Sequence, residues 1–277
     1  MASAGQGDRD DPMQATGPDW QPLLHPGPGT PASAGLPPLR CCLLSGGSSR
    51  RMGRDKALLP HPDGGTWLER SLLLLASLQA PITLLSRHPA HLALARQLAA
   101  AGRLDASAPL LALAEPPPWE GPLRALERLL RTHPEERLLL CPVDMPWLDP
   151  ACLRTLLAAS EAAGTGPADP AWAAGATGPA LARPRGALVP EAPAIVLSHD
   201  GTRLQPLLGL YPPCPARLER LSASLAAGER SLLRWLAGER WHPLPLPGPA
   251  LRNVNRPEQL PGAAPPAAPP PEGSQPA

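Results

Sequence analysis

The chain has 277 residues, of which 43% are apolar, and a formal net charge of +1. This length allows one substantial hydrophobic core or two small ones. Acidic and basic residues are mixed throughout, which argues against nucleic acid or an anionic membrane surface as a partner. No apolar run approaches the length of a membrane span, and acidic residues stand where a signal peptide has its basic start, so we expect a cytoplasmic protein.

Composition divides the chain into a central part and two ends. Residues 1–38 and 261–277 are rich in Pro, Gly and Ala and lack apolar periodicity, so we expect disordered tails. We expect residues 39–260 to form one domain. Inside it, residues 164–192 are again rich in Gly, Ala and Pro, which predicts an irregular insertion on the surface.

Apolar runs of strand length alternate with longer segments of helical periodicity. The predicted strands are residues 40–45, 82–86, 109–115, 137–144 and 194–200, and the predicted helices between them are 66–80, 89–102, 121–133 and 150–164. After the insertion we expect an apolar run at 202–211, helices near 215–228 and 229–238, and a final strand and turn at 251–260. Such alternation is typical of β-α units, so we predict an α/β fold with a mostly parallel sheet.

The loop that follows the first predicted strand, "LLSGGSSRRMGRDKALLP" at residues 43–60, is rich in Gly, Ser and positive charge. In open α/β sheets ligands bind at the carboxyl ends of strands, and glycines let backbone N–H groups approach a phosphate. A Walker loop is excluded because Gly47 and Gly53 are one residue too far apart, and a dinucleotide-binding fingerprint is excluded because Ser48 replaces its second glycine. The loop therefore predicts a phosphate site of another kind.

Lys56 in this loop is the only lysine of the chain, since every other basic residue apart from histidine is an arginine. An ammonium is a compact point charge and a guanidinium is a flat fork, so a site that needs one ammonium on one oxygen does not accept arginine. A general preference for arginine in the composition is the alternative explanation. The position of Lys56 in the loop favours a functional role.

Five segments resemble one known family in their order and spacing. The pattern L-x-G-G-x-x-x-R-M-G-x-D-K at residues 44–56 is followed by "GPLRAL" at 121–126, "CPVDMPWLDP" at 141–150, "SHDGTRLQPLLGLY" at 198–211 and "NVNRPEQL" at 253–260. Over about residues 40–260 the chain thus resembles the molybdenum cofactor guanylyltransferases, a branch of the nucleotidyltransferases. The resemblance implies a three-layer, Rossmann-like sandwich of the nucleotide-diphospho-sugar transferase type. It also implies Mg²⁺-dependent transfer of GMP from GTP to the phosphate of Mo-molybdopterin, with release of pyrophosphate.

The resemblance also implies roles for the motif residues. Arg51 would bind the β- and γ-phosphates, where a bidentate guanidinium is suited, and Lys56 would neutralise the α-phosphate. Asp144, at the end of a predicted buried strand, would hold Mg²⁺. Without the resemblance, Asp144 is as readily a turn or cap residue as a metal ligand, because aspartate before proline often starts a turn. The nucleotide would also be contacted through the backbone of Leu44, Ser45, Gly46 and Gly47.

Two departures from the family pattern leave the base open. Glu115 stands where the family has an aspartate before G-P-L, and Leu84 stands where it has an asparagine after the second strand. A related enzyme that uses CTP or another phosphate acceptor therefore remains an alternative. A further alternative is a non-catalytic nucleotide-binding adaptor in molybdoenzyme assembly.

The acceptor side is assigned to the later motifs. From the sequence alone, His199 is as readily a structural histidine as a ligand-binding one. Asn253 and Asn255 are likewise as readily residues that fix a turn as residues that bind the acceptor. The implied partners are GTP and Mo-molybdopterin, together with molybdopterin-handling proteins and apo-molybdoenzymes. The residues expected to line the acceptor site are His199, Asp200, Arg203, Asn253 and Asn255.

Overall fold

The structure is a computed structural model that describes residues 35–164 and 192–260. Residues 1–34 and 261–277, which make up most of the predicted tails, and residues 165–191 of the predicted insertion lie outside the described part.

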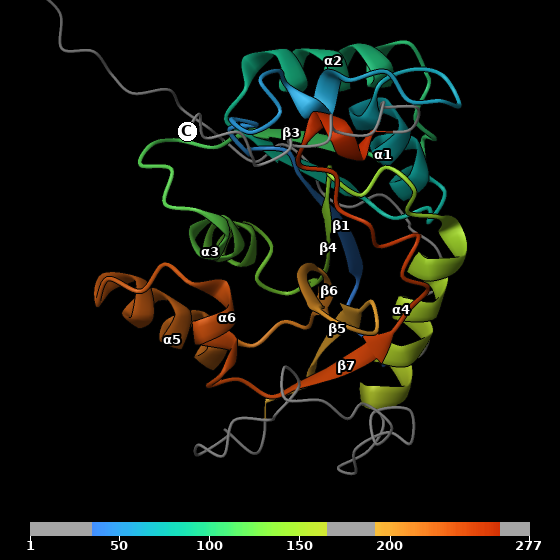
Figure 1. Ribbon diagram of the computed structural model, residues 1–277. Coiled ribbons are helices and arrows are strands. Elements are labelled where there is room, and N and C mark those ends of the chain that lie inside the picture. Colours follow the sequence, from blue (N-terminus) through green and yellow to red (C-terminus); the bar gives the residue numbers. More distant parts are fainter. Residues whose placement is uncertain (1–34, 165–191, 261–277) are drawn as a thin grey trace, which may run out of the picture.

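The described residues form a seven-stranded sheet (Figure 1). Its order is β3-β2-β1-β4-β6-β5-β7. Only β6 runs antiparallel to its neighbours in this sheet, while all other neighbouring strands are parallel, so the predicted mostly parallel sheet is confirmed. The strands are β1 (Leu39–Leu44), β2 (Ile82–Ser86), β3 (Leu110–Ala114), β4 (Arg137–Pro142), β5 (Ile195–His199), β6 (Leu204–Tyr211) and β7 (Trp241–Pro245).

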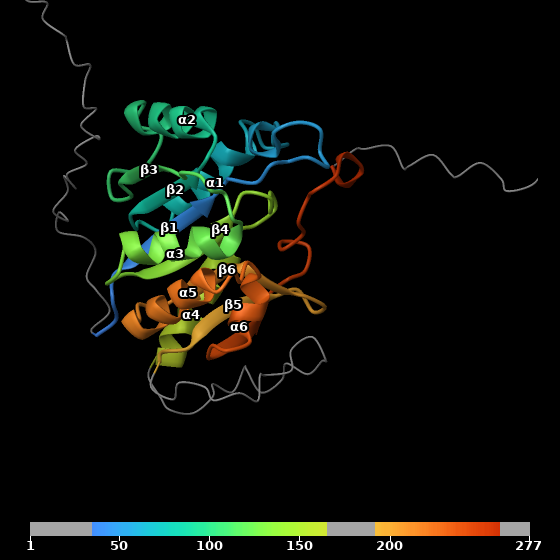
Figure 2. The same ribbon diagram turned by 90° about the vertical axis from the view of Figure 1, so that its left-hand side faces the viewer.

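Helices cover both faces of the sheet, which gives the predicted three layers (Figures 1 and 2). Side chains alternate along each strand, so Cys41 and Leu43 join the core under α1, α2 and α4, whereas Cys42 joins the core under α3, α5 and α6. No helix among the described residues is long and apolar enough to cross a membrane. The helices are α1 (Trp67–Ala76), α2 (Pro89–Ala100), α3 (Pro122–Thr132), α4 (Pro150–Gly164), α5 (Pro215–Ala226) and α6 (Leu232–Leu236), with short 3₁₀-helices η1 (Lys56–Leu58) and η4 (Pro257–Gln259).

Local signals in the sequence define several helix ends. Thr66 caps α1 through a capping box: the Glu69 N–H donates to the Thr66 hydroxyl at 3.2 Å and the Thr66 N–H donates to the Glu69 carboxylate at 2.6 Å. The Asp149 carboxylate accepts from the Cys152 N–H at 2.8 Å at the start of α4. Both side chains satisfy N–H groups that have no partner within the helix.

The end of the chain differs from the prediction. Residues 251–260 contain η4 and no strand, so the predicted final strand is wrong. The last strand is β7, which the sequence did not indicate because it contains Pro243 and Pro245. Proline is tolerated here because β7 lies at the edge of the sheet and pairs only with β5 in it. The apolar run at 202–211 became β6.

The order of the strands defines where a ligand can bind. The chain runs from the central β1 outward to β2 and β3, and then returns to the other side of β1 as β4. At such a reversal, the connections after neighbouring strands leave in opposite directions and open a crevice at their carboxyl ends. The Gly-rich loop follows β1 and Asp144 follows β4, so both lie at this crevice.

Candidate active site

A cavity of about 310 Å³, here called the central pocket, lies at the carboxyl ends of β1 to β4. Leu44, Leu85 and Pro142 line it from β1, β2 and β4, and Glu115 lines it from the residue directly after β3. Gly46 and Gly47 of the loop also border it. Of the four loop residues expected at the nucleotide, these two and Leu44 therefore line the pocket.

Lys56 lies at the centre of a polar cluster that borders the pocket. Its Nζ donates to the Asp144 carboxylate at 2.7 Å and to the Asn255 side-chain oxygen at 2.9 Å. Asp144 is also tied to the last loop, since its backbone carbonyl accepts from the Val254 N–H at 3.0 Å. An ammonium has three N–H donors, so Lys56 retains one for a phosphate oxygen. The structure thus brings together Lys56, Asp144 and Asn255, from three distant parts of the chain.

A buried histidine, His91 on α2, connects this cluster to the sheet. Its Nε2 lies 2.7 Å from Asp55, and its Nδ1 lies 3.0 Å from the carbonyl oxygen of Ser45 and 3.0 Å from the Ser86 hydroxyl. Asp55 in turn accepts from the Ala57 N–H at 3.1 Å and so caps η1, the short helix on which Lys56 stands. His91 was not predicted as a site residue, because no local pattern in the sequence relates residue 91 to residue 55.

Ser45 does not line the pocket. It is buried beneath the loop, and its N–H donates to the Leu85 carbonyl at 3.1 Å. Met52 is also buried, which anchors the middle of the loop on the core. Arg51 is exposed on the loop, and its neighbours Arg50 and Arg54 border a shallow hollow of about 390 Å³ outside the central pocket. The basic part of the loop therefore faces outward.

Glu115 lies against the glycine loop. A Cβ atom on Gly46 would stand only 2.7 Å from the Glu115 carboxylate, so a larger residue there would displace the Glu115 side chain from its present position. The Arg128 guanidinium donates to the other carboxylate oxygen at 3.0 Å. Burial raises the pKa of Glu115, although the charges of Arg128 and Arg87 oppose that shift.

Trp119, which was not predicted as a site residue, is exposed and lines the edge of the pocket. Its Nε1–H donates to the Glu115 carbonyl at 3.0 Å, and the Arg87 guanidinium carbon lies 5.1 Å from the centre of its ring. Both side chains line the pocket. Leu84, which stands where the family has an asparagine, is buried in the core, and the nearby Leu85 and Arg87 line the pocket instead.

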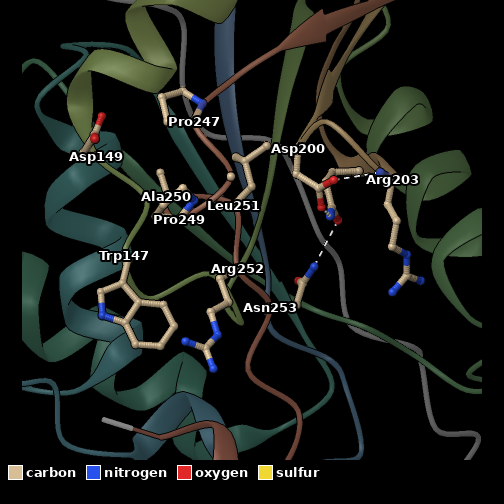
Figure 3. A pocket seen from close by; sticks show the side chains of 12 residues that line it. Trp147, Asp149, Asp200, Arg203, Pro247, Pro249, Ala250, Leu251, Arg252 and Asn253 are labelled. Carbon is tan, nitrogen blue, oxygen red and sulfur yellow. Dashed lines mark hydrogen bonds between the residues drawn. The ribbon is translucent and has the colours of Figure 1, made fainter. Parts of the chain in front are cut away.

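A second cavity of about 840 Å³, here called the outer groove, lies beside the cluster of Lys56, Asp144 and Asn255 (Figure 3). Figure 3 shows Trp147 and Arg252 on one side of it and Asp200 and Arg203 on the other, with Asn253 between them. The Arg252 guanidinium carbon lies 5.7 Å from the centre of the Trp147 ring. The three predicted acceptor residues Asp200, Arg203 and Asn253 therefore meet in one groove.

The other two predicted acceptor residues lie elsewhere. His199 is buried, and its Nδ1 accepts from the Gly201 N–H at 3.0 Å. Asn255 is the partner of Lys56 described above. Asn253 donates to the Gln205 side-chain oxygen at 3.0 Å. Two asparagines only two positions apart thus serve the groove and the Lys56 cluster respectively.

Asp200 mainly organises its own turn. Burial raises the pKa of Asp200, but hydrogen bonds from the Thr202 and Arg203 N–H groups, the Thr202 hydroxyl and Gln205 outweigh that effect and lower it to about 2. The carboxylate is therefore charged over the whole physiological range and has its lone pairs largely engaged by the chain itself.

The residues present fit one mode of Mg²⁺ binding. Within residues 35–164 and 192–260, no group of three or more His, Cys, Asp or Glu side chains forms a protein-only metal cage. Mg²⁺ is often held by one or two carboxylates while substrate phosphates and waters fill the remaining positions. Asp144 is a single carboxylate that borders the pocket, so it fits Mg²⁺ that arrives with a triphosphate.

A glycine-rich basic loop and a Lys–Asp pair at the switch point of a mostly parallel sheet define a protein of the nucleotidyltransferase class. Residues 41–243 match the family described as the MobA-like NTP transferase domain, and the chain belongs to this family.

Two relatives are similar over nearly their whole length. The probable molybdenum cofactor guanylyltransferase of Rhodopirellula baltica is 33% identical over 233 residues, which cover 82% of this chain and 92% of the relative. The molybdenum cofactor guanylyltransferase of Pseudomonas syringae pv. syringae is 30% identical over 234 residues, which cover 83% and 94%.

Solved structures share the fold. The molybdopterin-guanine dinucleotide biosynthesis protein A of Archaeoglobus fulgidus superposes with a TM-score of 0.50 at 17% identity, over 79% of this chain and 93% of that one. The 4-diphosphocytidyl-2C-methyl-D-erythritolsynthase of Anaerococcus prevotii superposes with a TM-score of 0.51 at 9% identity, over 80% and 94%. The predicted nucleotide-diphospho-sugar transferase type of sandwich is thus confirmed.

Proposed function

We propose that this protein transfers GMP from GTP to the terminal phosphate of Mo-molybdopterin and releases pyrophosphate. Membership of the family and the two relatives named as molybdenum cofactor guanylyltransferases support this assignment. The observation that carries it is the contact of Lys56 with Asp144 and Asn255, because this cluster joins the central pocket to the loop that lines the outer groove. A donor in the pocket and an acceptor in the groove would meet there.

The chemistry needs charge placement and no protein nucleophile. An oxygen of the acceptor phosphate attacks the α-phosphorus of GTP, a new P–O bond forms, and the bond from the α-phosphorus to the α,β-bridging oxygen breaks. Lys56 would donate to an α-phosphate oxygen and stabilise the charge that develops on it. Arg51, with Arg50 and Arg54 on the same loop, would bind the leaving pyrophosphate, for which a bidentate guanidinium is suited.

Asp144 would hold the Mg²⁺ that accompanies the triphosphate. When bound, the ion neutralises phosphate charge and orients the phosphates for in-line attack. The backbone of Leu44, Gly46 and Gly47 would border the nucleotide, while Ser45 would act from beneath by fixing the loop to β2.

The Glu115 carboxylate favours guanine over cytosine as the base of the donor nucleotide. Guanine presents two adjacent donors, N1–H and the 2-amino group, whereas cytosine presents one amino group beside an acceptor. A carboxylate only accepts, so Glu115 can satisfy both donors of guanine and only one of cytosine. The oxygen of Glu115 that faces Gly46 points toward the loop side of the pocket.

The direct test is incubation of the protein with GTP, Mg²⁺ and molybdopterin-molybdate, with detection of the dinucleotide product and pyrophosphate. Parallel calorimetric titrations with GTP and CTP test the base, and we expect tighter binding of GTP. A clear preference for CTP would support the related enzyme. Nucleotide binding without pyrophosphate release would support the non-catalytic adaptor.

The proposal extends to the organisation of the chain. We assign the catalytic domain to residues 39–260, and we propose molybdopterin-handling proteins and apo-molybdoenzymes as protein partners. Limited proteolysis followed by the transfer assay tests the domain limits, since a fragment close to 39–260 should keep full activity.

A further inference from the structure

Trp119 is placed as a ligand-binding side chain. Among the described residues that line the central pocket it is the only aromatic one. It is also one of the few large apolar side chains left on the surface of the described residues, with 53% of its area exposed. A large aromatic ring at the mouth of a pocket is more typical of a binding surface than of a packing residue.

The ring is held in place despite its exposure. The indole N–H donates to the Glu115 carbonyl at 3.0 Å, and Arg87 lies 5.1 Å from the ring centre. Glu115 is itself fixed by its ion pair with Arg128 at 3.0 Å. A ring that is already ordered loses little conformational entropy when a ligand binds to it.

The chemistry of the surroundings defines the ligand. The pocket has a carboxylate at Glu115 and an ammonium at Lys56, and the basic loop passes beside it. A molecule that fits must therefore combine a phosphate chain near Lys56 with a flat ring that carries hydrogen-bond donors near Glu115. The phosphates and the base of a purine nucleotide have these two properties.

We propose that Trp119 stacks on the purine base of the donor nucleotide and is a specificity-determining residue for purine over pyrimidine. This inference rests on the proposed function and deepens it. Stacking grows with the overlapping ring area, so the two fused rings of a purine gain more than the single ring of a pyrimidine. Because every base has a π-face, Trp119 selects ring size, while the carboxylate of Glu115 selects the donors on the base edge. The hydrogen bond from the Trp119 indole N–H to the Glu115 carbonyl holds the two residues side by side, so both can contact the same base.

The test compares ligands with and without a base. Calorimetric titrations in Mg²⁺ measure the Kd of GTP, CTP and inorganic triphosphate for the wild type, Trp119→Ala, Trp119→Phe and Leu233→Ala. Leu233 is a matched surface control, since it is also exposed but lies on α6. We expect Trp119→Ala to raise the Kd of GTP about tenfold or more, which is the usual effect of removing a ring that stacks on a base. The effect on CTP should be smaller, and Kd for triphosphate should not change.

The remaining variants decide between stacking and a structural role. Trp119→Phe keeps a ring and should recover most of the GTP affinity, and Leu233→Ala should bind as the wild type does. Equal weakening of GTP and triphosphate by Trp119→Ala, or no weakening of GTP, would overturn the proposal. The proposed function can fail while this inference stands. In that case the wild type binds GTP and Trp119→Ala weakens GTP binding as described, but no dinucleotide product forms.

Discussion

The central pocket and the outer groove are built in different ways. The pocket lies at the ends of parallel strands, and its polar side chains are paired with one another, as Lys56 is with Asp144 and Glu115 with Arg128. The groove is more than twice as large and is formed by the β5–β6 turn, the loop that ends at Asn253 and the segment before α4 that carries Trp147. A paired, strand-supported site suits one defined ligand, whereas a wide groove suits a larger one that is held at a few points.

The two regions meet at Lys56. One of its partners follows β4 and the other belongs to the last loop, whose preceding residues line the groove. Lys56 should therefore matter to the chemical step rather than to either substrate alone, and variants around it can separate the two regions.

The largest effect is expected for Lys56→Ala. Loss of the ammonium removes charge stabilisation at the α-phosphate, which should lower kcat about 100- to 1,000-fold with a smaller change in the KM of either substrate. Steady-state release of pyrophosphate measures it. Lys56→Arg keeps the charge but not the compact geometry, so we expect it to recover little activity. An arginine variant as active as the wild type would contradict the role of a single ammonium.

The sequence predicted the framework of the site better than its details. The glycine-rich loop after β1 and Asp144 after β4 border the same pocket, and the strand pattern alone places the ends of these two segments at one edge of the sheet. The side-chain contacts across the fold were not predictable in this way. Asn255 was expected at the acceptor, and its contact with Lys56 depends on how a loop 199 residues away returns to the sheet.

The missed aromatic residues have a similar explanation. Trp119 lies outside the five motif segments, and Trp147 lies inside the segment at 141–150 but was given no role there. Their contacts with Arg87 and Arg252 link segments that only tertiary structure brings together. Proline-containing β7 was missed because strand patterns rely on β-branched residues, and its place at the edge of the sheet became visible only in the fold.

A pair of asparagine variants separates the two regions more finely. Asn255→Ala removes the acceptor that orients Lys56, and a hydrogen bond to a charged group of this kind corresponds to about a tenfold loss, here in kcat. Asn253→Ala, the matched control two positions earlier, breaks only the bond to Gln205 in the groove. It should raise the KM of the acceptor a few-fold and leave kcat and the KM of GTP unchanged. A fall in kcat for both variants would show that the loop acts as one unit.

Arg252→Ala tests whether the groove holds the acceptor at few points. Arg252 is exposed and lines the groove, so the loss of its charge should raise the KM of an anionic acceptor by about two- to fivefold, the usual range for one exposed ion pair. The KM of GTP should stay constant. Arg234→Ala is a suitable control, since Arg234 is an exposed arginine on α6 outside both sites. An equal rise in the KM of GTP would show that pocket and groove are not independent.

Asp200→Asn should have the smallest effect of these variants. It should lower the free energy of unfolding slightly, and the pH dependence of this loss shows whether it comes from the ionised Asp200 carboxylate. The folded-state pKa of Asp200 is about 2, below the usual value of about 3.9, so the ionised carboxylate stabilises the fold above pH 4. This contribution is lost as the pH falls from about 4 to about 2. Urea unfolding of the wild type and the variant should therefore differ slightly at pH 5 and converge toward pH 2.

The control for Asp200 is a second turn of the same kind. Asp105 accepts from the N–H and the hydroxyl of Ser107, and these hydrogen bonds likewise lower the pKa of its carboxyl. Asp105→Asn should show the same sign of pH dependence in unfolding but leave the KM of the acceptor unchanged, because it lies outside the groove. Asp200→Asn should raise that KM slightly, since its turn positions Arg203. If both variants leave the acceptor KM unchanged, the turn at Asp200 supports the fold alone, and recognition in the groove rests on Arg252 and Asn253.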